Sequence, residues 1–220
     1  FSQNTTRDLW QTPGLLDGYG IKSYPRLKHF SGALFGQLDW SLTDKLSILP
    51  GIRLNYDDKE VDFSRFTYGG LETVDPALIA IKNSVYSNQS FTAQVDDTNL
   101  SGQLTLAYKF SDQFNAYATY ATGFKPVGLN LGGLPTAAGQ PILELAVIKP
   151  EEASHIEFGL KTSPTRNSVL NITFFNTDIK DYQTQVQAAD LSVNRGYLAN
   201  AEKVRVRGIE LDGSLKVQDF

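Results

Sequence analysis

The chain has 220 residues, and its 20 basic and 24 acidic side chains give a net charge of −4, which argues against a nucleic-acid partner. It contains no cysteine, so disulfides and thiolate metal sites are excluded. No apolar run approaches the roughly 18 residues of a membrane helix, so a membrane helix is excluded but a membrane β-barrel is not.

About seven strands are predicted from segments in which apolar and polar residues alternate, because a period of two is the signature of a strand. The clearest unit is the hairpin over 99–125, where Leu100, Leu104 and Leu106 alternate with polar residues and a three-residue turn joins the two arms. Each arm has roughly the 9–11 residues of a membrane-crossing strand. In chain order the predicted strands lie near residues 30–42, 46–63, 99–110, 113–125, 152–162, 168–186 and 203–217.

Two positions predict irregular pairing. Pro50 lies inside a predicted strand and favours a bulge, since proline lacks a ladder donor. Around Gly208 the apolar parity changes from Val204 and Val206 to Ile209 and Leu211, and a one-residue bulge would keep both sets on the same face.

The connections between the strands are short at one end of the predicted sheet and long at the other. The turns after Leu42, Phe110 and Thr162 are short, whereas residues 64–98 and 126–150 form long connections, the first with a helix-compatible segment over Val74 to Lys82. Outer-membrane barrels show this asymmetry, with the long loops extracellular. The predicted fold is all-β, an antiparallel up-and-down transmembrane β-barrel of which this chain is a part; a soluble β-sandwich is the alternative.

Four motifs then suggest a family. They are Tyr117-Ala118-Thr119-Tyr120-Ala121-Thr122-Gly123-Phe124-Lys125-Pro126, Lys149-Pro150-Glu151-Glu152 followed by Glu157, Gly159 and Lys161, Phe174 through Tyr182-Gln183, and Asn200-Ala201 through Leu211. In this order they resemble the barrel of TonB-dependent outer-membrane receptors.

The resemblance implies a 22-stranded barrel with a plug in its lumen, in the outer membrane of a Gram-negative bacterium. Residues 1–220 would be a fragment of its C-terminal barrel domain, without the plug and the TonB box. The absence of methionine agrees with a piece of a larger protein.

The implied function is active uptake of a scarce ligand, with a ferric siderophore as the leading candidate, driven by the TonB inner-membrane complex through an N-terminal region that the chain lacks. The expected partners are outer-membrane lipid, the TonB complex and a small ligand. The alternatives are a passive outer-membrane porin and a soluble β-sandwich binding module. No motif assembles an acid–base pair, a nucleophile or a metal site, so we expect neither an enzyme nor a cofactor.

Candidate ligand-binding residues are chiefly aromatic and basic side chains on the expected extracellular loops, because such groups hold an anionic chelate by charge and stacking. They are Arg65, Phe66, Tyr68, Tyr86, Lys125, Asn130, Arg195 and Tyr197.

Overall fold

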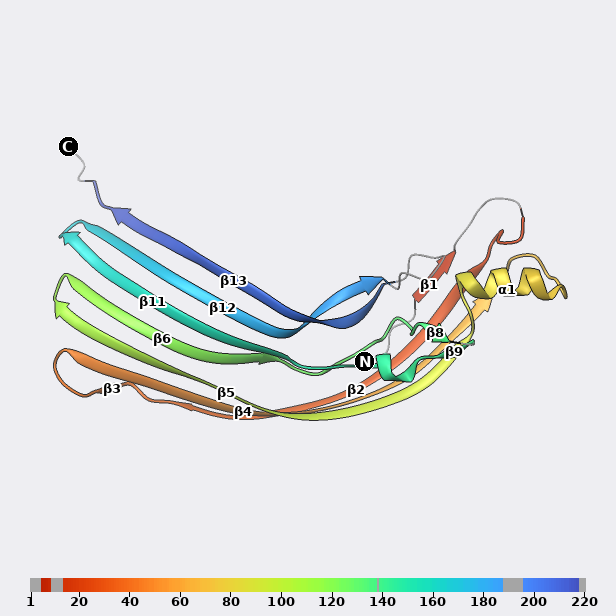
Figure 1. Ribbon diagram of the computed structural model, residues 1–220, viewed down its shortest axis with the longest axis horizontal. Coiled ribbons are helices and arrows are strands. Elements are labelled where there is room, and N and C mark those ends of the chain that lie inside the picture. The colour runs from red at the N-terminus through yellow and green to blue at the C-terminus, as the bar shows by residue number, and fades with distance from the viewer. Residues whose placement is uncertain (1–4, 9–13, 138, 188–195, 218–220) are drawn as a thin grey trace.

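The computed structural model describes residues 5–8, 14–137, 139–187 and 196–217. One curved antiparallel sheet dominates it, in the order β1-β2-β4-β5-β6-β11-β12-β13, and β3 pairs with β4 (Figure 1). The strands of this sheet are β1 (Thr5–Asp8), β2 (Gly20–Gln37), β3 (Trp40–Ser41), β4 (Leu46–Tyr68), β5 (Gln89–Ser111), β6 (Phe114–Lys125), β11 (Glu151–Thr165), β12 (Ser168–Gln187) and β13 (Gly196–Leu215). The described residues thus contain the seven long strands that the alternation predicted, and the sheet is not closed.

Several strands are longer than predicted. β2 begins at Gly20, β4 continues to Tyr68, β5 begins at Gln89 and β13 begins at Gly196. The expected loop over 64–98 is therefore corrected to the shorter connection 69–88, and it holds the helix α1 (Pro76–Val85). The helix prediction is confirmed: the Asp75 side chain caps it by accepting a hydrogen bond from the Ala77 N–H (2.8 Å), and proline occupies its first turn.

The long connection over 126–150 is built from short pieces. These are β7 (Gly128–Leu129), β8 (Thr136–Ala137), β9 (Gln140–Pro141), the 3₁₀ turn η1 (Leu143–Leu145) and β10 (Val147–Ile148). β7 pairs with β10, and β8 pairs with β9. In Figure 1 this connection and α1 lie at the loop end of the sheet, and the short turns lie at the opposite turn end.

The two faces of the sheet differ in chemistry. One, here called the apolar face, exposes large apolar side chains in cross-strand rows such as Leu34–Leu54–Leu100 and Leu106–Ala118–Phe158–Phe174–Ile209. The other, the polar face, presents Asn55, Gln103, Thr119, Glu157 and Thr173. This division follows directly from the alternation in the sequence.

Toward the loop end the apolar residues change faces. On β4 they point to the apolar face as far as Tyr56, and then Val61 and Phe63 point to the polar face. The strand itself continues in register with β5 throughout. The strand predicted over 46–63 includes this change of face and ends five residues before β4 does.

The predicted bulge at Gly208 is absent. The β12–β13 register runs without a shift through Phe175↔Gly208, so Val206 lies on the polar face and Ile209 on the apolar face. A Cβ at Gly208 would lie 2.9 Å from the Phe175 ring, so the glycine makes room for an aromatic ring from the neighbouring strand.

Pro50 does not produce a bulge toward β5 either, since it pairs with Leu104 in unshifted register. Its effect falls on the other edge, between β2 and β3. Its carbonyl accepts from the Leu38 N–H (3.0 Å), but without an N–H it cannot donate in return, and the strand assignment is interrupted at Leu38 and Asp39.

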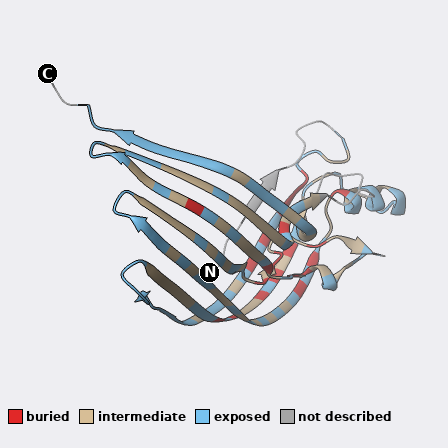
Figure 2. Cartoon of the chain, turned by 60° about the vertical axis from the view of Figure 1, so that its left-hand side comes forward, coloured by how far each residue is buried: buried red, intermediate tan, exposed pale blue. Residues whose placement is uncertain are grey.

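The buried core lies at the loop end, on the polar face (Figure 2). Val61 and Phe63 are fully buried, and the Phe63 ring stacks on Phe91 with 4.9 Å between centroids. Leu134 and Ala146 of the connection 126–150 pack on this cluster. The connection therefore folds back against the wall formed by β4 and β5.

Candidate functional site

A polar network at the loop end joins the connection 126–150 to the sheet. At its centre is Gln183 of β12, whose amide nitrogen donates to the carbonyls of Pro126 and Lys149, each at 2.9 Å. The Gln183 backbone N–H donates to Oε1 of Glu151 (2.7 Å), and the same oxygen accepts from the Lys125 ammonium at 3.1 Å. One glutamine thus holds the points where the chain leaves the sheet and returns to it.

Asn200 of β13 extends the network. Its amide nitrogen donates to the carbonyls of Lys149 (3.0 Å) and Asp181 (2.6 Å), and its oxygen accepts from the Lys149 N–H (3.0 Å). Asp181 has a positive φ of 50°, a conformation that aspartate tolerates better than most residues. The network therefore ties β12, β13 and the end of the connection together.

Asn130 fastens the connection a second time. Its amide nitrogen donates to the carbonyls of Leu145 (2.7 Å) and Leu198 (2.9 Å), and its oxygen accepts from the Leu198 N–H (2.9 Å). Only 4% of Asn130 is exposed. Predicted as a ligand contact, it lies instead in a buried bridge between the connection and β13.

Arg65 and Tyr86 are brought together. The Arg65 guanidinium lies 5.6 Å from the centre of the Tyr86 ring, and its Nε donates to the Ser87 carbonyl (3.1 Å). Arg65 is 2% exposed and points to the polar face of β4, not into a loop. These contacts hold the return from α1 into β5 against the wall.

The other candidates are spread over the molecule. Phe66 and Tyr68 lie on β4 with the parity of the apolar face, Phe66 exposed beside Tyr24 and Tyr68 beneath the Lys22 ammonium. Tyr197 has the same parity on β13, whereas Lys125 is exposed on the polar face. Arg195 lies outside the described residues. The seven candidates within the described residues therefore do not form one site.

Sequence reasoning missed Glu151, Gln183 and Asn200 as members of one site. All three belong to the motifs that carried the family resemblance, which is the signal that could have found them. Their proximity depends on strand register and on the path of the connection, and neither can be read from the separate motifs.

Farther from the loops, the polar face carries linked hydrogen bonds. The Tyr117 hydroxyl donates to Glu157 (2.6 Å), and His155 lies within hydrogen-bond distance of Glu157 (3.3 Å) and Thr177 (2.8 Å). Gly159 leaves room for the Tyr117 ring, since a Cβ there would come within 2.1 Å of it. Within the described ranges no three metal-ligating side chains gather at one point.

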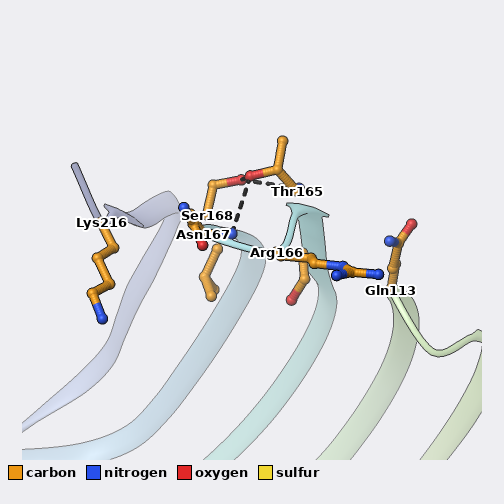
Figure 3. Close-up of a pocket in the computed structure, with 8 residues that line it drawn as sticks. Gln113, Thr165, Arg166, Asn167, Ser168 and Lys216 are labelled. Carbon is orange, nitrogen blue, oxygen red and sulfur yellow. Dashed lines mark hydrogen bonds between the residues drawn. The ribbon is translucent and has the colours of Figure 1, made fainter. Parts of the chain in front are cut away.

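A hollow of about 370 Å³ lies at the turn end (Figure 3). It is lined by Gln113, Ser163, Thr165, Arg166, Asn167, Ser168, Val169 and Lys216. Nearby in the β5–β6 turn, a hydrogen bond from Lys109 and its positive charge hold the pKa of Asp112 below its usual value. This hollow lies at the other end of the strands from the loop-end network.

No helix in the described part of the chain is long and apolar enough to cross a membrane. The family model described as TonB dependent receptor-like, beta-barrel matches residues 2–219. The chain belongs to this family, whose members reside in the outer membrane of Gram-negative bacteria. In outer-membrane barrels an apolar face of this kind contacts lipid, and a polar face lines the lumen.

Individual relatives agree with this assignment. The pesticin receptor of Yersinia enterocolitica is 26% identical over 180 residues, which are 82% of this chain and 23% of that protein. The ferric yersiniabactin uptake receptor FyuA from Yersinia pestis superimposes with a TM-score of 0.65 at 23% identity, over 96% of this chain and 27% of that one. The siderophore receptor PiuA from Acinetobacter baumannii gives 0.58 at 21% identity, over 91% and 24%. The chain thus spans about a quarter of the length of these relatives.

Proposed function

We propose that these residues form part of the wall and mouth of an active-transport receptor that takes up a ferric siderophore and is driven by the TonB complex. The receptor architecture in this proposal rests on the loop-end network, in which the motif residues Glu151, Gln183 and Asn200 hold the connection 126–150 against the lumen wall. The similarity to FyuA, a ferric yersiniabactin uptake receptor, and to the siderophore receptor PiuA supports uptake of an iron chelate. Under this proposal the chain is not an enzyme and acts by binding and gating.

The network leaves cationic groups at the mouth of the lumen. Lys125 and Lys149 are both exposed at the base of the connection, and only Lys125 has an acidic oxygen within ion-pair distance among the described residues. Exposed ammonium groups beside a lumen attract and bind an anionic chelate. We assign Lys125 and Lys149 to the first ligand contacts, and the buried Arg65 and Asn130 to positioning of the loops.

The proposed orientation places the loop end outside the cell and the short turns in the periplasm. The connections 69–88 and 126–150 are then extracellular, and the turn-end hollow faces the periplasm. Coupling to TonB would act through a plug and an N-terminal segment, which these residues do not include.

The test is uptake of radioactive iron–siderophore complexes by cells that express the complete reading frame containing this chain and no other siderophore receptor. We expect uptake with an intact TonB complex and its loss without TonB. Uptake that is unchanged by deletion of TonB would refute the proposal and favour a porin.

The cationic mouth is tested by the double variant Lys125→Gln/Lys149→Gln. We expect a higher KM at an unchanged maximal rate, because ligand capture is weakened while gating is not. Lys216→Gln at the turn end is the matched control and should leave KM unchanged; equal effects of both variants would remove these lysines from ligand capture.

A further inference from the structure

Four basic side chains gather on the lipid-contacting face of β12 and β13, on the loop-end side of the apolar band. They are Lys180, Lys203, Arg205 and Arg207, and we call them the basic patch. All four are exposed, and they share the parity of Ile209 and Phe174, which belong to the apolar band below them. The patch thus continues the lipid-contacting surface beyond its hydrophobic part.

Two carboxylates only partly balance this charge. Asp178 accepts two hydrogen bonds from Arg205, at 2.6 and 3.2 Å, and lies 3.5 Å from the Lys203 ammonium. Glu152 pairs with Lys180 in the β11–β12 register. Four positive charges against two negative ones leave the patch at +2. Within the described chain, Lys180 and Arg207 have no acidic oxygen within 4.0 Å.

The part of β2, β4 and β5 on the loop-end side of their own apolar band has the opposite charge balance. Its outward-facing basic residues are Lys22, Arg26 and Lys28, and its acidic ones are Asp58, Glu60, Asp62 and Asp96. Three positive charges against four negative ones give −1, and Lys28 is already paired with Glu60 at 3.0 Å. The excess of positive charge is therefore local to β12 and β13.

We propose that the basic patch binds the phosphate groups of a phosphorylated lipid in the leaflet around the loop end. This proposal rests on the orientation given above. From Ile209 to Arg207 is one outward step of roughly 7 Å along the strand, so Arg207 lies where hydrocarbon gives way to headgroups. Arg207 and Arg205 carry the planar fork that matches a phosphate, and Asp178 holds Arg205 in place.

Two features favour a phosphorylated lipid as the ligand of the basic patch: its net positive charge and its continuity with the lipid-contacting band. A lipid whose acyl chains lie on Phe174 and Ile209 brings its headgroup to Arg207 and Lys203, whereas a neutral headgroup would leave the excess charge unmatched. Basic residues near an anionic membrane surface strengthen binding by about fivefold each.

The experiment titrates the full chain, in a neutral detergent, with lipid A carrying two phosphates and with the same lipid after dephosphorylation, and follows the complex by native mass spectrometry. We expect the phosphorylated lipid to bind at least tenfold more tightly, with an affinity that falls as salt is raised. Equal binding of the two lipids would overturn the proposal without any variant being needed.

Variants then locate the contact. Lys180→Gln/Lys203→Gln/Arg207→Gln should weaken binding of phosphorylated lipid A by roughly 100-fold, and Arg207→Gln alone by about fivefold. The control Lys22→Gln/Arg26→Gln/Lys28→Gln removes the same charge from the same face and should change binding by less than about twofold. Equal losses in the two triple variants would show general attraction and refute the patch.

Lipid binding is independent of transport. A receptor that failed to take up a siderophore could still bind lipid A, and a transporter without lipid selectivity would refute only the patch. The two proposals therefore fail separately.

Discussion

Removal of the Gln183 side chain should release the connection 126–150 from the lumen wall. In Gln183→Ala the carbonyls of Pro126 and Lys149 each lose a hydrogen bond of 2.9 Å, while the backbone bond from residue 183 to Glu151 remains. At about 1 kcal/mol for each neutral hydrogen bond, the local free energy of opening falls by roughly 2 kcal/mol. The open population of the connection should rise by about 25-fold.

Hydrogen exchange measures this opening residue by residue. The Asn130 and Leu134 amides donate to Ala146 and to the Gln89 side chain, respectively, so their exchange should accelerate by the same factor in detergent micelles. Gln94→Ala is the matched control, because Gln94 is exposed on β5 and makes a single 3.3 Å bond to Asp58. Unchanged exchange at both amides in Gln183→Ala would refute the role of the network as the fastening of this connection.

Two further substitutions test the sheet itself. Ile52→Arg places a charge in the middle of the apolar band and should lower the free energy of unfolding in lipid by about 2–4 kcal/mol. The control Thr92→Arg lies on the same face but above the band and should lower it by no more than about 1 kcal/mol. Similar losses for the two variants in denaturant titrations would place the band elsewhere. Gly159→Ala puts a Cβ 2.1 Å from the Tyr117 ring and should lower the free energy of unfolding by about 1–3 kcal/mol. In the control Gly123→Ala the new Cβ meets nothing within 4 Å, so stability should not change. Equal melting temperatures of the two variants would contradict the packing of the Tyr117 ring over Gly159.

The seven long strands were predictable because lipid and lumen impose one alternation on each of them. Leu100, Leu104 and Leu106 repeat at a period of two over a full membrane crossing, and short polar turns separate the arms. The physical constraint is strong there, since a charged residue facing the hydrocarbon is costly. Such a constraint is visible in a single sequence.

The upper parts of the strands were not predictable by the same rule. Beyond Tyr56 the apolar side chains Val61 and Phe63 of β4 turn inward to pack under the connection 126–150. The alternation persists with its parity reversed; on β13 the parity also changes between Val206 and Ile209, but Val206 stays exposed. A reversed parity without a register shift marks the level at which apolar packing moves from lipid to the protein interior.

The candidate ligand-binding residues divide into buried and exposed ones. Arg65 and Asn130 have residue types that suit a ligand, but both are buried and donate to backbone carbonyls, Arg65 to Ser87 and Asn130 to Leu145 and Leu198. Exposure is set by the path of the connection, which a single sequence does not reveal. Lys125 combines the expected chemistry with exposure at the mouth, so it remains a candidate for ligand contact.

The motif residues identify the family but not the ligand, and the structure gives the reason. Glu151, Gln183 and Asn200 bind backbone carbonyls and N–H groups, and these contacts serve any receptor that must hold a loop against its lumen wall. Residues with that task identify the architecture whatever the ligand is. Selectivity must come from exposed side chains farther out on the connections, where no backbone partner fixes the residue type. Exchanging the tips of the connections should therefore change the ligand, whereas changes in the network should alter loop order for every ligand.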